Sequence, residues 1–392
     1  MLYVQSFLRQ LLLSPLLCAW ILLLLPHVHP MSLEMTSSSL SSSISRVAVV
    51  TGASRGIGRG IAIELGAKGY TVYCLGRSSR HSTTTTDPRR RPVAPGLDVT
   101  VESTAEQVTE RGGTGIGLSC DLSQDGIIET ILQQIYDKER RLDMIVCSAY
   151  TTPHTTNDPQ SSGGLRGEFW TQGMDMWDAI NGLGLRQVYA ACRAAAPSMI
   201  ETAAAHKEVA PLICLVSSFG GKSYTFNVAY GIGKAAVDRM ATDMSYQLRK
   251  YGVATTALYP GLVRTEANLQ MVVDGTWDEA SGNLDLEQGE SPEFSGRAVA
   301  TLASLGKDAM MARSGNVEVV AELAKEFAFT DIDGCQPPSI RSLKYLLPNF
   351  VFPQIEKEAG KPIPRWVKDN IPDILLPWSI FSSGPPPEMD TR

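Results

Sequence analysis

Short apolar runs alternate with helical patterns along most of the chain. Six runs have the length and composition of buried strands, and they occupy residues 47–51, 71–75, 116–120, 142–147, 212–216 and 254–259. Between these runs apolar residues recur every three or four positions, as at Ile57, Ile61 and Leu65, which predicts amphipathic helices. The first helix is expected to end at Gly69, acting as its C-cap. Strands that alternate with helices predict an α/β fold with a single doubly wound parallel sheet and helices on both faces.

The segments without this alternation set the expected domain boundaries. Residues 1–30 include an apolar stretch, 11–25, which predicts a secretory signal or a membrane anchor, and 31–45 form a Ser-rich linker. The α/β domain is expected over 46–322, with a surface insertion at 81–95 and a loop over the substrate at 262–292. Residues 323–392 form a C-terminal extension, in which the apolar and aromatic segment 366–381 either lies at a membrane surface or packs on the domain.

Composition and charge narrow the classes of function. The 392 residues are 43% hydrophobic and 19% charged, as in ordinary globular proteins. The net charge of −6 provides no positive field for DNA or RNA, so no nucleic-acid partner is expected. The seven cysteines include no CxxC pair and the five histidines form no cluster with cysteines or acids, so no metal site is expected. The apolar N-terminal segment predicts a location at the endoplasmic reticulum membrane with the α/β domain in the cytosol, whereas a start at Met31 would give a cytoplasmic protein.

A glycine-rich loop follows the first strand and leads into the first helix. Its sequence, at 51–58, is TGASRGIG. Glycines allow a sharp turn and a close approach of the backbone to a ligand, and the start of a helix offers N–H groups and a partial positive charge to phosphates. In this context the loop predicts a Rossmann-type site for a dinucleotide. The expected cofactor-binding residues of the loop are Gly52, Ser54, Arg55, Gly56, Ile57 and Gly58.

The end of the second strand indicates which dinucleotide binds. A carboxylate at this place binds the ribose 2′-hydroxyl of NAD, whereas an arginine binds the 2′-phosphate of NADP. Here the strand leads into Arg77, with no acidic residue before Asp87, and Arg55 in the loop can reach the same phosphate. NADP(H) is therefore the expected cofactor and NAD(H) the less favoured one. The alternative is that Arg77 is an ordinary surface arginine.

Two other strand ends are expected to line the cofactor site. Asp121 and Leu122 follow the third strand, where Asp121 either meets the adenine ring or caps a helix that begins near Ser123. Ser148 and Ala149 follow the fourth strand.

Tyr230 and Lys234 are the main candidates for acid–base chemistry. They are four residues apart at the start of a predicted helix, so the phenol and the ammonium lie on one helix face. A nearby lysine charge, and a nicotinamide that turns cationic, favour the phenolate and lower the pKa of the phenol from its usual value of about 10. The pair is therefore predicted to transfer a proton at neutral pH.

Ser218 and Asn181 complete the candidate site. Ser218 follows the fifth strand, and its hydroxyl either binds a substrate oxygen or caps the turn; Ser217 is assigned to the end of the strand. Asn181 precedes Gly182 and Gly184 in a helical pattern, which indicates either a local helix distortion that holds a water or an ordinary core amide.

Together these motifs resemble the short-chain dehydrogenase/reductase family. They occur in the order of that family: TGxxxGIG at 51–58, Asn181, Ser218, YxxxK at 230–234 and Pro-Gly at 260–261. The likeness covers about 46–322. Segments 176–178, 226–231, 260–266 and 331–334 resemble one subgroup of the family in particular, up to about Gly334.

The resemblance implies a role for each of these residues. Tyr230 would be the general acid/base, and Lys234 would lower its pKa and bind the nicotinamide ribose. Ser218 would position the carbonyl, and Asn181 would hold a water that relays protons towards Lys234. Contacts with the nicotinamide and the pyrophosphate would come from Pro260, Gly261, Val263 and Thr265. The family commonly pairs subunits through two of its helices, so a homo-oligomer is also implied.

One departure from the family pattern concerns the fourth strand. Where the family has Asn-Asn-Ala-Gly, this chain has Cys147-Ser148-Ala149-Tyr150, of which Tyr150 is similar to the subgroup. The missing first asparagine removes an amide that would tie neighbouring strands together. Ser148 is expected to replace part of this link.

The predicted function is the reduction of a carbonyl by an NADPH-dependent oxidoreductase. The substrate is expected to be a ketone or aldehyde that becomes an alcohol, with Tyr230 as the general acid. Met271, Val272, Val273 and Trp277 in the loop over the substrate favour an apolar small molecule. Two alternatives remain: NAD-dependent alcohol oxidation by the same site, and a catalytically silent sensor or scaffold that binds NADP(H).

Overall fold

The computed structural model describes residues 45–81, 94, 96–151, 168–281 and 284–381. Of these, residues 46–340 form one compact unit and residues 341–381 belong to a second. The predicted signal or anchor segment (1–30), the Ser-rich linker up to residue 44 and most of the predicted insertion (82–93 and 95) lie outside the described residues.

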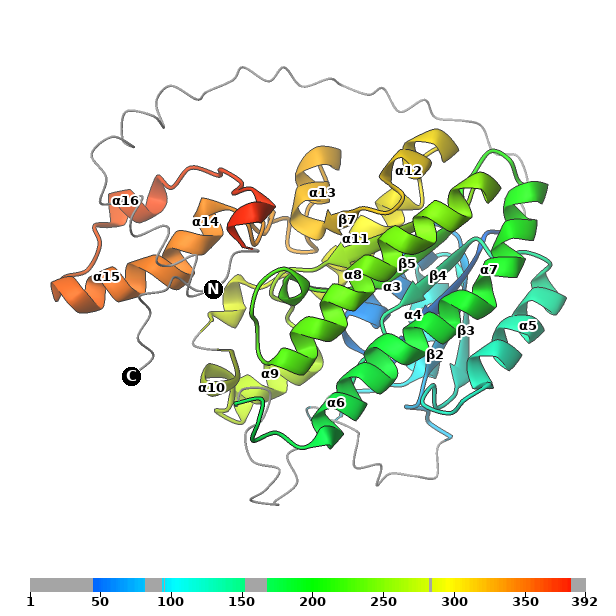
Figure 1. Ribbon diagram of the computed structural model, residues 1–392, viewed down its shortest axis with the longest axis horizontal. Coiled ribbons are helices and arrows are strands. Elements are labelled where there is room, and N and C mark those ends of the chain that lie inside the picture. Colours follow the sequence, from blue (N-terminus) through cyan, green and yellow to red (C-terminus); the bar gives the residue numbers. More distant parts are fainter. Residues whose placement is uncertain (1–44, 82–93, 95, 152–167, 282–283, 382–392) are drawn as a thin grey trace. The chain divides into compact units, whose positions relative to one another are not determined.

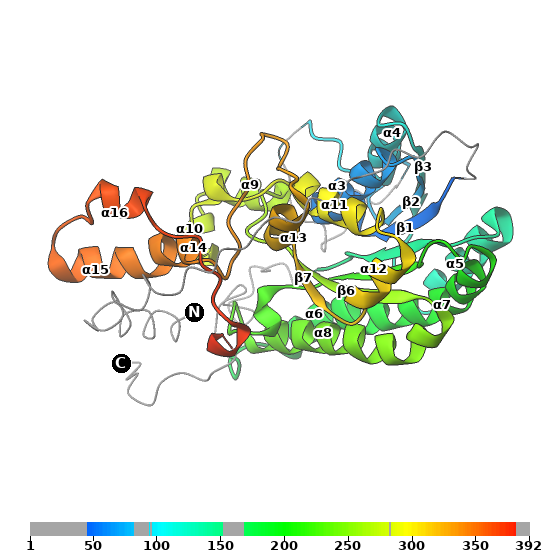
Figure 2. The ribbon, with the colours of Figure 1, turned by 90° about the horizontal axis from the view of Figure 1, so that it is seen from above.

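The larger unit is built on one parallel sheet, drawn in Figures 1 and 2. Its seven described strands follow the order β3-β2-β1-β4-β5-β6-β7. All neighbouring strands are parallel, with Ala48 of β1 opposite both Val72 of β2 and Met144 of β4. The strands are β1 Val47–Thr51, β2 Thr71–Gly76, β3 Thr114–Ser119, β4 Met144–Cys147, β5 Leu212–Val216, β6 Ala254–Tyr259 and β7 Val317–Val319.

Helices cover both faces of this sheet, and each face has its own apolar core. Figure 2 shows α3, α4 and α11 on one side and α5, α7 and α8 on the other. The helices are α3 Gly56–Gly66, α4 Val101–Glu110, α5 Ile127–Glu139, α7 Gln187–Ala205, α8 Val228–Leu248, α11 Pro292–Leu302 and α13 Val320–Phe327. The predicted doubly wound α/β fold is therefore confirmed.

The element boundaries differ from the prediction in a few places. β7, a strand of three residues, is absent from the sequence prediction because so short a run has no alternation to recognise. Helix α3 ends at Gly66 with Ala67 as its C-cap, so Gly69 is not the cap. Gly69 instead takes a positive φ of 75° in the turn before β2, where its N–H donates to the Gly66 carbonyl at 2.8 Å.

The shorter elements lie at the loops of the sheet or in the second unit. In the larger unit they are α6 Met174–Asn181, the π-helix Gly182–Arg186, α9 Glu266–Val273, α10 Trp277–Ser281, α12 Lys307–Arg313 and three 3₁₀ turns, Phe219–Gly221, Arg249–Tyr251 and Leu286–Gln288. In the second unit they are α14 Leu343–Leu346, the π-helix Leu347–Val351, α15 Phe352–Ala359, α16 Arg365–Asp369 and the 3₁₀ turn Trp378–Ile380.

Segment 366–381 is not one continuous amphipathic helix. It consists of the end of α16, an irregular stretch and one 3₁₀ turn; Trp366 is exposed, whereas Leu376 and Phe381 are buried. Its placement at a membrane surface stays a prediction. Across the described part of the chain, no helix is both long and apolar enough to cross a membrane.

Close packing of α3 against α11 gives the first testable prediction. A Cβ on Gly60 would lie 2.2 Å from the backbone carbon of Pro292, so Gly60→Ala must separate the two helices. We expect the free energy of unfolding to fall by about 1–3 kcal/mol, measured by chemical denaturation. Gly306→Ala, at a glycine with open space around it, is the control and should cost less. Equal losses for the two variants would contradict the prediction.

Candidate active site

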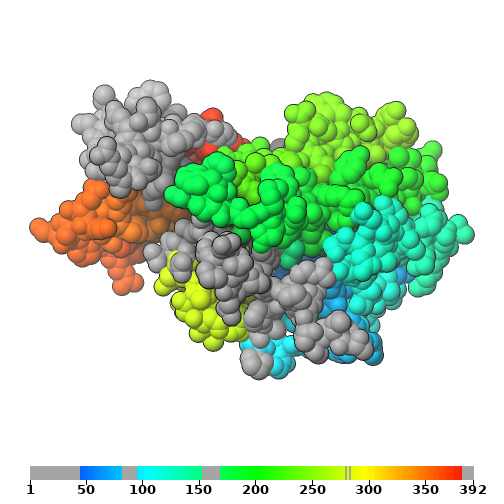
Figure 3. Space-filling view, turned by 60° about the horizontal axis from the view of Figure 1, so that its bottom comes forward, coloured from blue at the N-terminus to red at the C-terminus, as the bar shows by residue number. Residues whose placement is uncertain are grey.

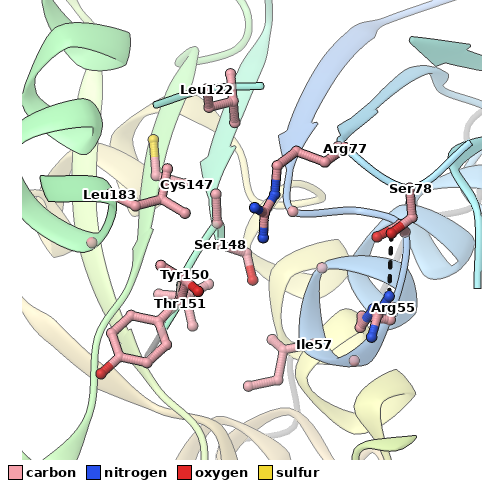
Figure 4. Close-up of a pocket in the computed structure, with 18 of the residues that line it drawn as sticks. Arg55, Ile57, Arg77, Ser78, Leu122, Cys147, Ser148, Tyr150, Thr151 and Leu183 are labelled. Atoms are coloured by element: carbon pink, nitrogen blue, oxygen red, sulfur yellow. Dashed lines mark hydrogen bonds between the residues drawn. The ribbon is translucent and has the colours of Figure 1, made fainter. Parts of the chain in front are cut away.

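A cleft of about 970 Å³ opens where the order of the strands reverses, between β1 and β4. At such a point the loops that follow two neighbouring strands turn to opposite sides and leave a crevice at the carboxyl edge of the sheet. The glycine-rich loop after β1 forms one wall, as Figure 4 shows, and Cys147 to Thr151 after β4 form the other.

The glycine-rich loop fits tightly against the end of β4. Gly52 has a φ of 69°, and a Cβ there would lie 2.7 Å from the Cα of Ala149. A Cβ on Gly58 would lie 2.4 Å from the Gly52 carbonyl oxygen, so the loop and the first turn of α3 can approach only without side chains. This packing directs the N-terminus of α3 into the cleft.

An anion already lies at this helix start. The N–H of Gly56 donates to Oε2 of Glu266, at the start of α9, over 2.7 Å. Helix N-termini bind carboxylates and phosphates by the same N–H groups. The carboxylate therefore stands in for a phosphate, and the loop has the shape and the donors that the pyrophosphate of a dinucleotide requires.

Two arginines lie on the side of the cleft formed by β1 and β2. The Nη2 of Arg55 donates to the Ser78 hydroxyl at 3.2 Å, and Figure 4 shows the Arg77 side chain extending into the cleft towards the side that carries Ser148. Among the described residues that line the cleft, the acids are Asp121 and Glu266. The side of the cleft next to β2 is thus lined by cations.

Asp121 lines the cleft but does not cap a helix near Ser123. Its Oδ1 accepts hydrogen bonds from the Ser123 N–H at 3.0 Å and from the Ser123 hydroxyl at 2.7 Å. Helix α5 begins only at Ile127, after Gly126. The capping interpretation is therefore wrong, because the carboxylate closes a local turn four residues before the helix.

Thr51 joins the two strands at the reversal point. Its hydroxyl donates to the Val146 carbonyl at 3.3 Å and accepts the N–H groups of Ser148 and Ala149 at 3.1 and 3.2 Å. These three bonds tie β1 to the end of β4, at the place where the missing family asparagine was expected to weaken the sheet. The hydroxyl of Thr51 therefore joins the two strands, and Ser148 contributes its backbone N–H rather than its side chain.

Tyr230 lies in the first turn of α8. The side chain of Asn227 caps this helix and accepts the N–H of Tyr230 at 2.8 Å, which fixes the position of the residue. The Ser218 side chain lies close enough to the phenol to lower its pKa, and two rings meet the Tyr230 ring edge to face: Phe226 at 5.1 Å and Tyr150 at 6.1 Å between centroids. The predicted residues Ser218 and Tyr230 thus lie close together.

Lys234 lies one turn further along α8 and lines the same cleft. Its Nζ donates to the Val216 carbonyl at 3.1 Å and lies 5.9 Å from the centre of the Tyr230 ring. The ring of Tyr150 lies closer, at 5.0 Å, so a cation–π contact adds to the hydrogen bond. Tyr150 has no role in the sequence prediction, because aromatic contact with a lysine leaves no spacing pattern.

Burial moves both titrating groups towards their neutral forms. It raises the pKa of Tyr230 to about 12, an effect that Ser218 partly offsets and the charge of Asp238 increases. It also lowers the pKa of Lys234 to about 8, against the opposing charge of Asp238. Lys234 is not among the groups that shift the phenol's pKa in the protein alone, so the expectation that it lowers this pKa with the cofactor bound stays a prediction.

Ser217 and Ser218 have different surroundings. β5 ends at Val216, but the N–H of Ser217 still donates to the Leu258 carbonyl at 2.9 Å, so Ser217 continues the ladder as expected. Its hydroxyl donates to the backbone carbonyl of Lys234 at 3.3 Å. The Ser218 hydroxyl caps a 3₁₀ turn by accepting the N–H of Gly220 at 3.0 Å. The interpretation of Ser218 as the cap of the turn is therefore confirmed, and its binding of a substrate oxygen stays a prediction.

Asn181 lies beside the cleft rather than on its wall. The helix distortion predicted there is present as the π-helix Gly182–Arg186. The Nδ2 of Asn181 donates to the Ala229 carbonyl at 3.3 Å, and its buried Oδ1 has no hydrogen-bond partner within the described part of the protein. An oxygen in this state can accept a bond from a water.

The segment after β6 contributes only part of what was expected. Thr265 lines the cleft, whereas Pro260, Gly261 and Val263 are not among the lining residues. Val263 is buried and pairs with Glu290 in an isolated bridge, so its side chain packs inside the protein. The cofactor contacts expected of Pro260, Gly261 and Val263 stay predictions.

The remaining candidates line the cleft together. They are Gly52, Ser54, Arg55, Gly56, Ile57, Gly58, Arg77, Leu122, Ser148 and Ala149. Lining residues absent from the sequence prediction include Ser78, Tyr150, Thr151, Leu183 and Glu266. Position after a strand end could have indicated Ser78 and Thr151, whereas the contact of Glu266 with Gly56 joins residues 210 positions apart.

Residues 46–273 match the family model of short chain dehydrogenases, which includes the cleft and both halves of the sheet up to α9. The chain belongs to the short-chain dehydrogenase/reductase family. It is therefore an oxidoreductase.

Curated members of this family are similar over most of their length. The chain is 36% identical to dehydrogenase/reductase SDR family member 1 of Mus musculus over 312 residues, which is 77% of this chain and 88% of the relative. Identity to the Homo sapiens protein of the same name is 33% over 310 residues, with the same coverage. This is the subgroup indicated by the segments around Trp177, Tyr230, Pro260 and Gly334, and the resemblance to it is confirmed.

Solved structures of the short-chain dehydrogenase/reductase family share the fold. A short chain dehydrogenase from Mycobacterium paratuberculosis with NAD bound has a TM-score of 0.54 at 20% identity, covering 70% of this chain and 96% of its own. A candidate NAD(P)-dependent gluconate 5-dehydrogenase from Beutenbergia cavernae, with NADP at low occupancy, has a TM-score of 0.52 at 23% identity, covering 71% and 96%.

A buried carboxyl next to the cleft gives a prediction on pH. Burial raises the pKa of Glu290 to about 8, and the Gly261 N–H and the Ser295 hydroxyl are its hydrogen-bond donors. The unfolded chain ionises this group near pH 4.5, so its contribution to stability is complete below that pH and is lost as the pH rises through about 8. Glu290→Gln removes this dependence.

We expect the unfolding free energy of the wild-type protein to fall between pH 5 and pH 9 by roughly 4 kcal/mol more than that of Glu290→Gln. Chemical denaturation at several pH values measures the difference. Exposed Glu287, in the same loop, provides the control variant Glu287→Gln, which should follow the wild type. Parallel pH profiles for all three proteins would contradict the prediction.

Proposed function

We propose that this short-chain dehydrogenase/reductase uses NADPH to reduce an apolar ketone or aldehyde to the alcohol. The observation that supports this most is the position of Tyr230 and Lys234, one turn apart on α8, both on the wall of the cleft that holds the glycine-rich loop, with Ser218 close to the phenol. A proton donor, an oxygen-binding hydroxyl and a basic side chain are the groups that carbonyl reduction requires of the protein.

The residues of the cleft suit a nicotinamide dinucleotide. Gly52 and Gly58 leave room for the backbone to approach a pyrophosphate, and the Glu266 carboxylate shows that the start of α3 accepts an anion. Arg55, Arg77 and Ser78 would hold the 2′-phosphate of NADPH, because a guanidinium forms several charge-assisted hydrogen bonds to a phosphate. When bound, NADPH supplies the hydride that reaches the carbonyl carbon.

The residues of the protein would then donate the proton that the carbonyl oxygen requires. The raised pKa of Tyr230 keeps its phenol protonated at neutral pH, which is the form that donates to the carbonyl oxygen as the hydride arrives. The Ser218 hydroxyl would hold that oxygen and stabilise its developing negative charge. The product is an alcohol, and the phenolate left behind must be protonated again.

Lys234 and Asn181 are placed for this second proton transfer. With a pKa near 8, Lys234 can give up and regain a proton at physiological pH. The buried Oδ1 of Asn181 has the capacity to hold a water beside α8. We propose that such a water connects Lys234 to the solvent.

The proposal that the substrate is apolar is supported by the segment that follows β6. Helix α9 leaves Leu269, Val272 and Val273 exposed, at 47%, 48% and 78% of their surface. Figure 3 shows the α9–α10 segment, in yellow-green, at the surface. Exposed apolar side chains beside a cleft are suited to cover an apolar ligand.

The role of the phenol is tested with Tyr230→Phe. This variant keeps the ring but has no proton to donate, so we expect the rate of ketone reduction to fall at least about 100-fold while NADPH affinity changes little. Absorbance of NADPH measures the rate on a panel of ketones and aldehydes, and NADPH fluorescence measures affinity. Tyr224→Phe, at an exposed tyrosine nearby, is the matched control and should keep full activity.

Two results of this experiment would contradict the proposal. A Tyr230→Phe variant as active as the wild type would remove the phenol from the mechanism. A wild-type protein that binds NADPH but reduces none of the carbonyls at any pH would favour a silent sensor.

The choice of cofactor is tested with Arg77→Ala. Loss of the guanidinium should weaken NADPH binding by about 10-fold or more and leave NADH binding nearly unchanged, because only NADPH carries the 2′-phosphate. Fluorescence titration with each cofactor measures both constants. Arg239→Ala removes a similar charge from the exposed face of α8 and serves as the control. Tighter binding of NADH than NADPH by the wild type would favour the NAD-dependent alternative.

A further inference from the structure

We propose that Glu266 competes with the cofactor's pyrophosphate for the start of α3, and that cofactor binding therefore detaches α9 from the glycine-rich loop. The inference rests on the proposed function, because it takes a nicotinamide dinucleotide as the ligand of the cleft. It assigns to Glu266 a role in setting cofactor affinity and in linking the cofactor to the loop over the substrate.

The contact itself is specific. Oε2 of Glu266 accepts the N–H of Gly56 at 2.7 Å, while Oε1 lies 3.9 Å from Nη1 of Arg59. Only 16% of the Glu266 side chain is exposed, and the residue lines the cleft. The N–H at the start of α3 and the charge of Arg59 together determine the position of the Glu266 carboxylate.

A phosphate oxygen requires the same donor. Gly56 is the first residue of α3, and its N–H is among the groups that lack a partner within the helix. One N–H cannot serve a carboxylate and a phosphate equally, and two anions a few ångströms apart repel each other in a site that is partly shielded from water. The pyrophosphate must therefore displace the Glu266 carboxylate or bind less tightly.

Displacement affects α9 because Glu266 is its first residue. The helix is otherwise held near its start by Thr265, whose hydroxyl accepts the Asn268 N–H at 3.2 Å, and by Asn268, whose Nδ2 donates to the Val263 carbonyl at 2.8 Å. No residue of α9 is buried. The Gly56–Glu266 bond is therefore a direct link between the glycine-rich loop and the helix that exposes Val272 and Val273.

The test compares full-length wild type with Glu266→Gln and Glu287→Gln. NADPH affinity is measured by fluorescence titration, and the melting temperature is measured with and without NADPH. Glu266→Gln should bind NADPH about tenfold more tightly, because it removes one partly screened like charge next to the pyrophosphate. Glu287→Gln removes a charge from an exposed position of the adjoining loop and should match the wild type.

The melting temperatures add a result that a purely structural role would not give. Without NADPH, Glu266→Gln should melt below the wild type, because a neutral amide binds the helix start less strongly than a carboxylate. With saturating NADPH the order should reverse, because the variant gains more from the ligand. A variant that binds NADPH as the wild type does, or less tightly, would overturn the inference and leave the proposed function intact. Failure of the wild type to bind either NADPH or NADH would overturn both.

Discussion

The whole site depends on how closely α3 approaches its neighbours. Three glycines make this approach possible: Gly52 against Ala149, Gly58 against Gly52, and Gly60 against Pro292. With a side chain at any of them, the helix would move away from the sheet or from α11, and its start would no longer lie at the crevice between β1 and β4. The donors at the start of α3, the carboxylate that they bind and Arg55, the N-cap of the helix, are all positioned by this packing.

A second constraint concerns charge rather than shape. Tyr230 and Lys234 are placed where burial disfavours the ionised form of each, so the pKa of the phenol rises while that of the ammonium falls, and the two values move apart. The phenol and the amine therefore do not form a strong ion pair with each other. The protonation state of the pair responds to whatever charge enters the cleft, which is a useful property in a site whose ligand changes charge during the reaction.

The order of strands and helices was predictable because apolar runs and helical spacing are local. The dinucleotide loop and the Tyr230–Lys234 pair were predictable for the same reason, since each is a short motif next to a recognisable element. The contacts of Glu266 and Thr51 were not predictable, because each joins segments that are far apart in the sequence, even though both residues lie within recognised motifs. The direction of the Tyr230 pKa was missed because burial, which the spacing of two residues cannot reveal, is the largest influence on it.

Phe226 packs against Tyr230 of the active site and has a strained backbone conformation. It has a φ of 63°, a left-handed conformation that costs a non-glycine residue about 1 kcal/mol. The other described non-glycine residues with positive φ, Arg140 and Ala328, follow helix ends, where this conformation is common. Phe226 instead places its ring against the Tyr230 phenol. A glycine there would relieve the backbone but leave the phenol less confined. Selection for thermal stability alone would therefore favour a glycine at this position, although the phenol would then be less well ordered. The stability of the fold and the order of the active site are in conflict here.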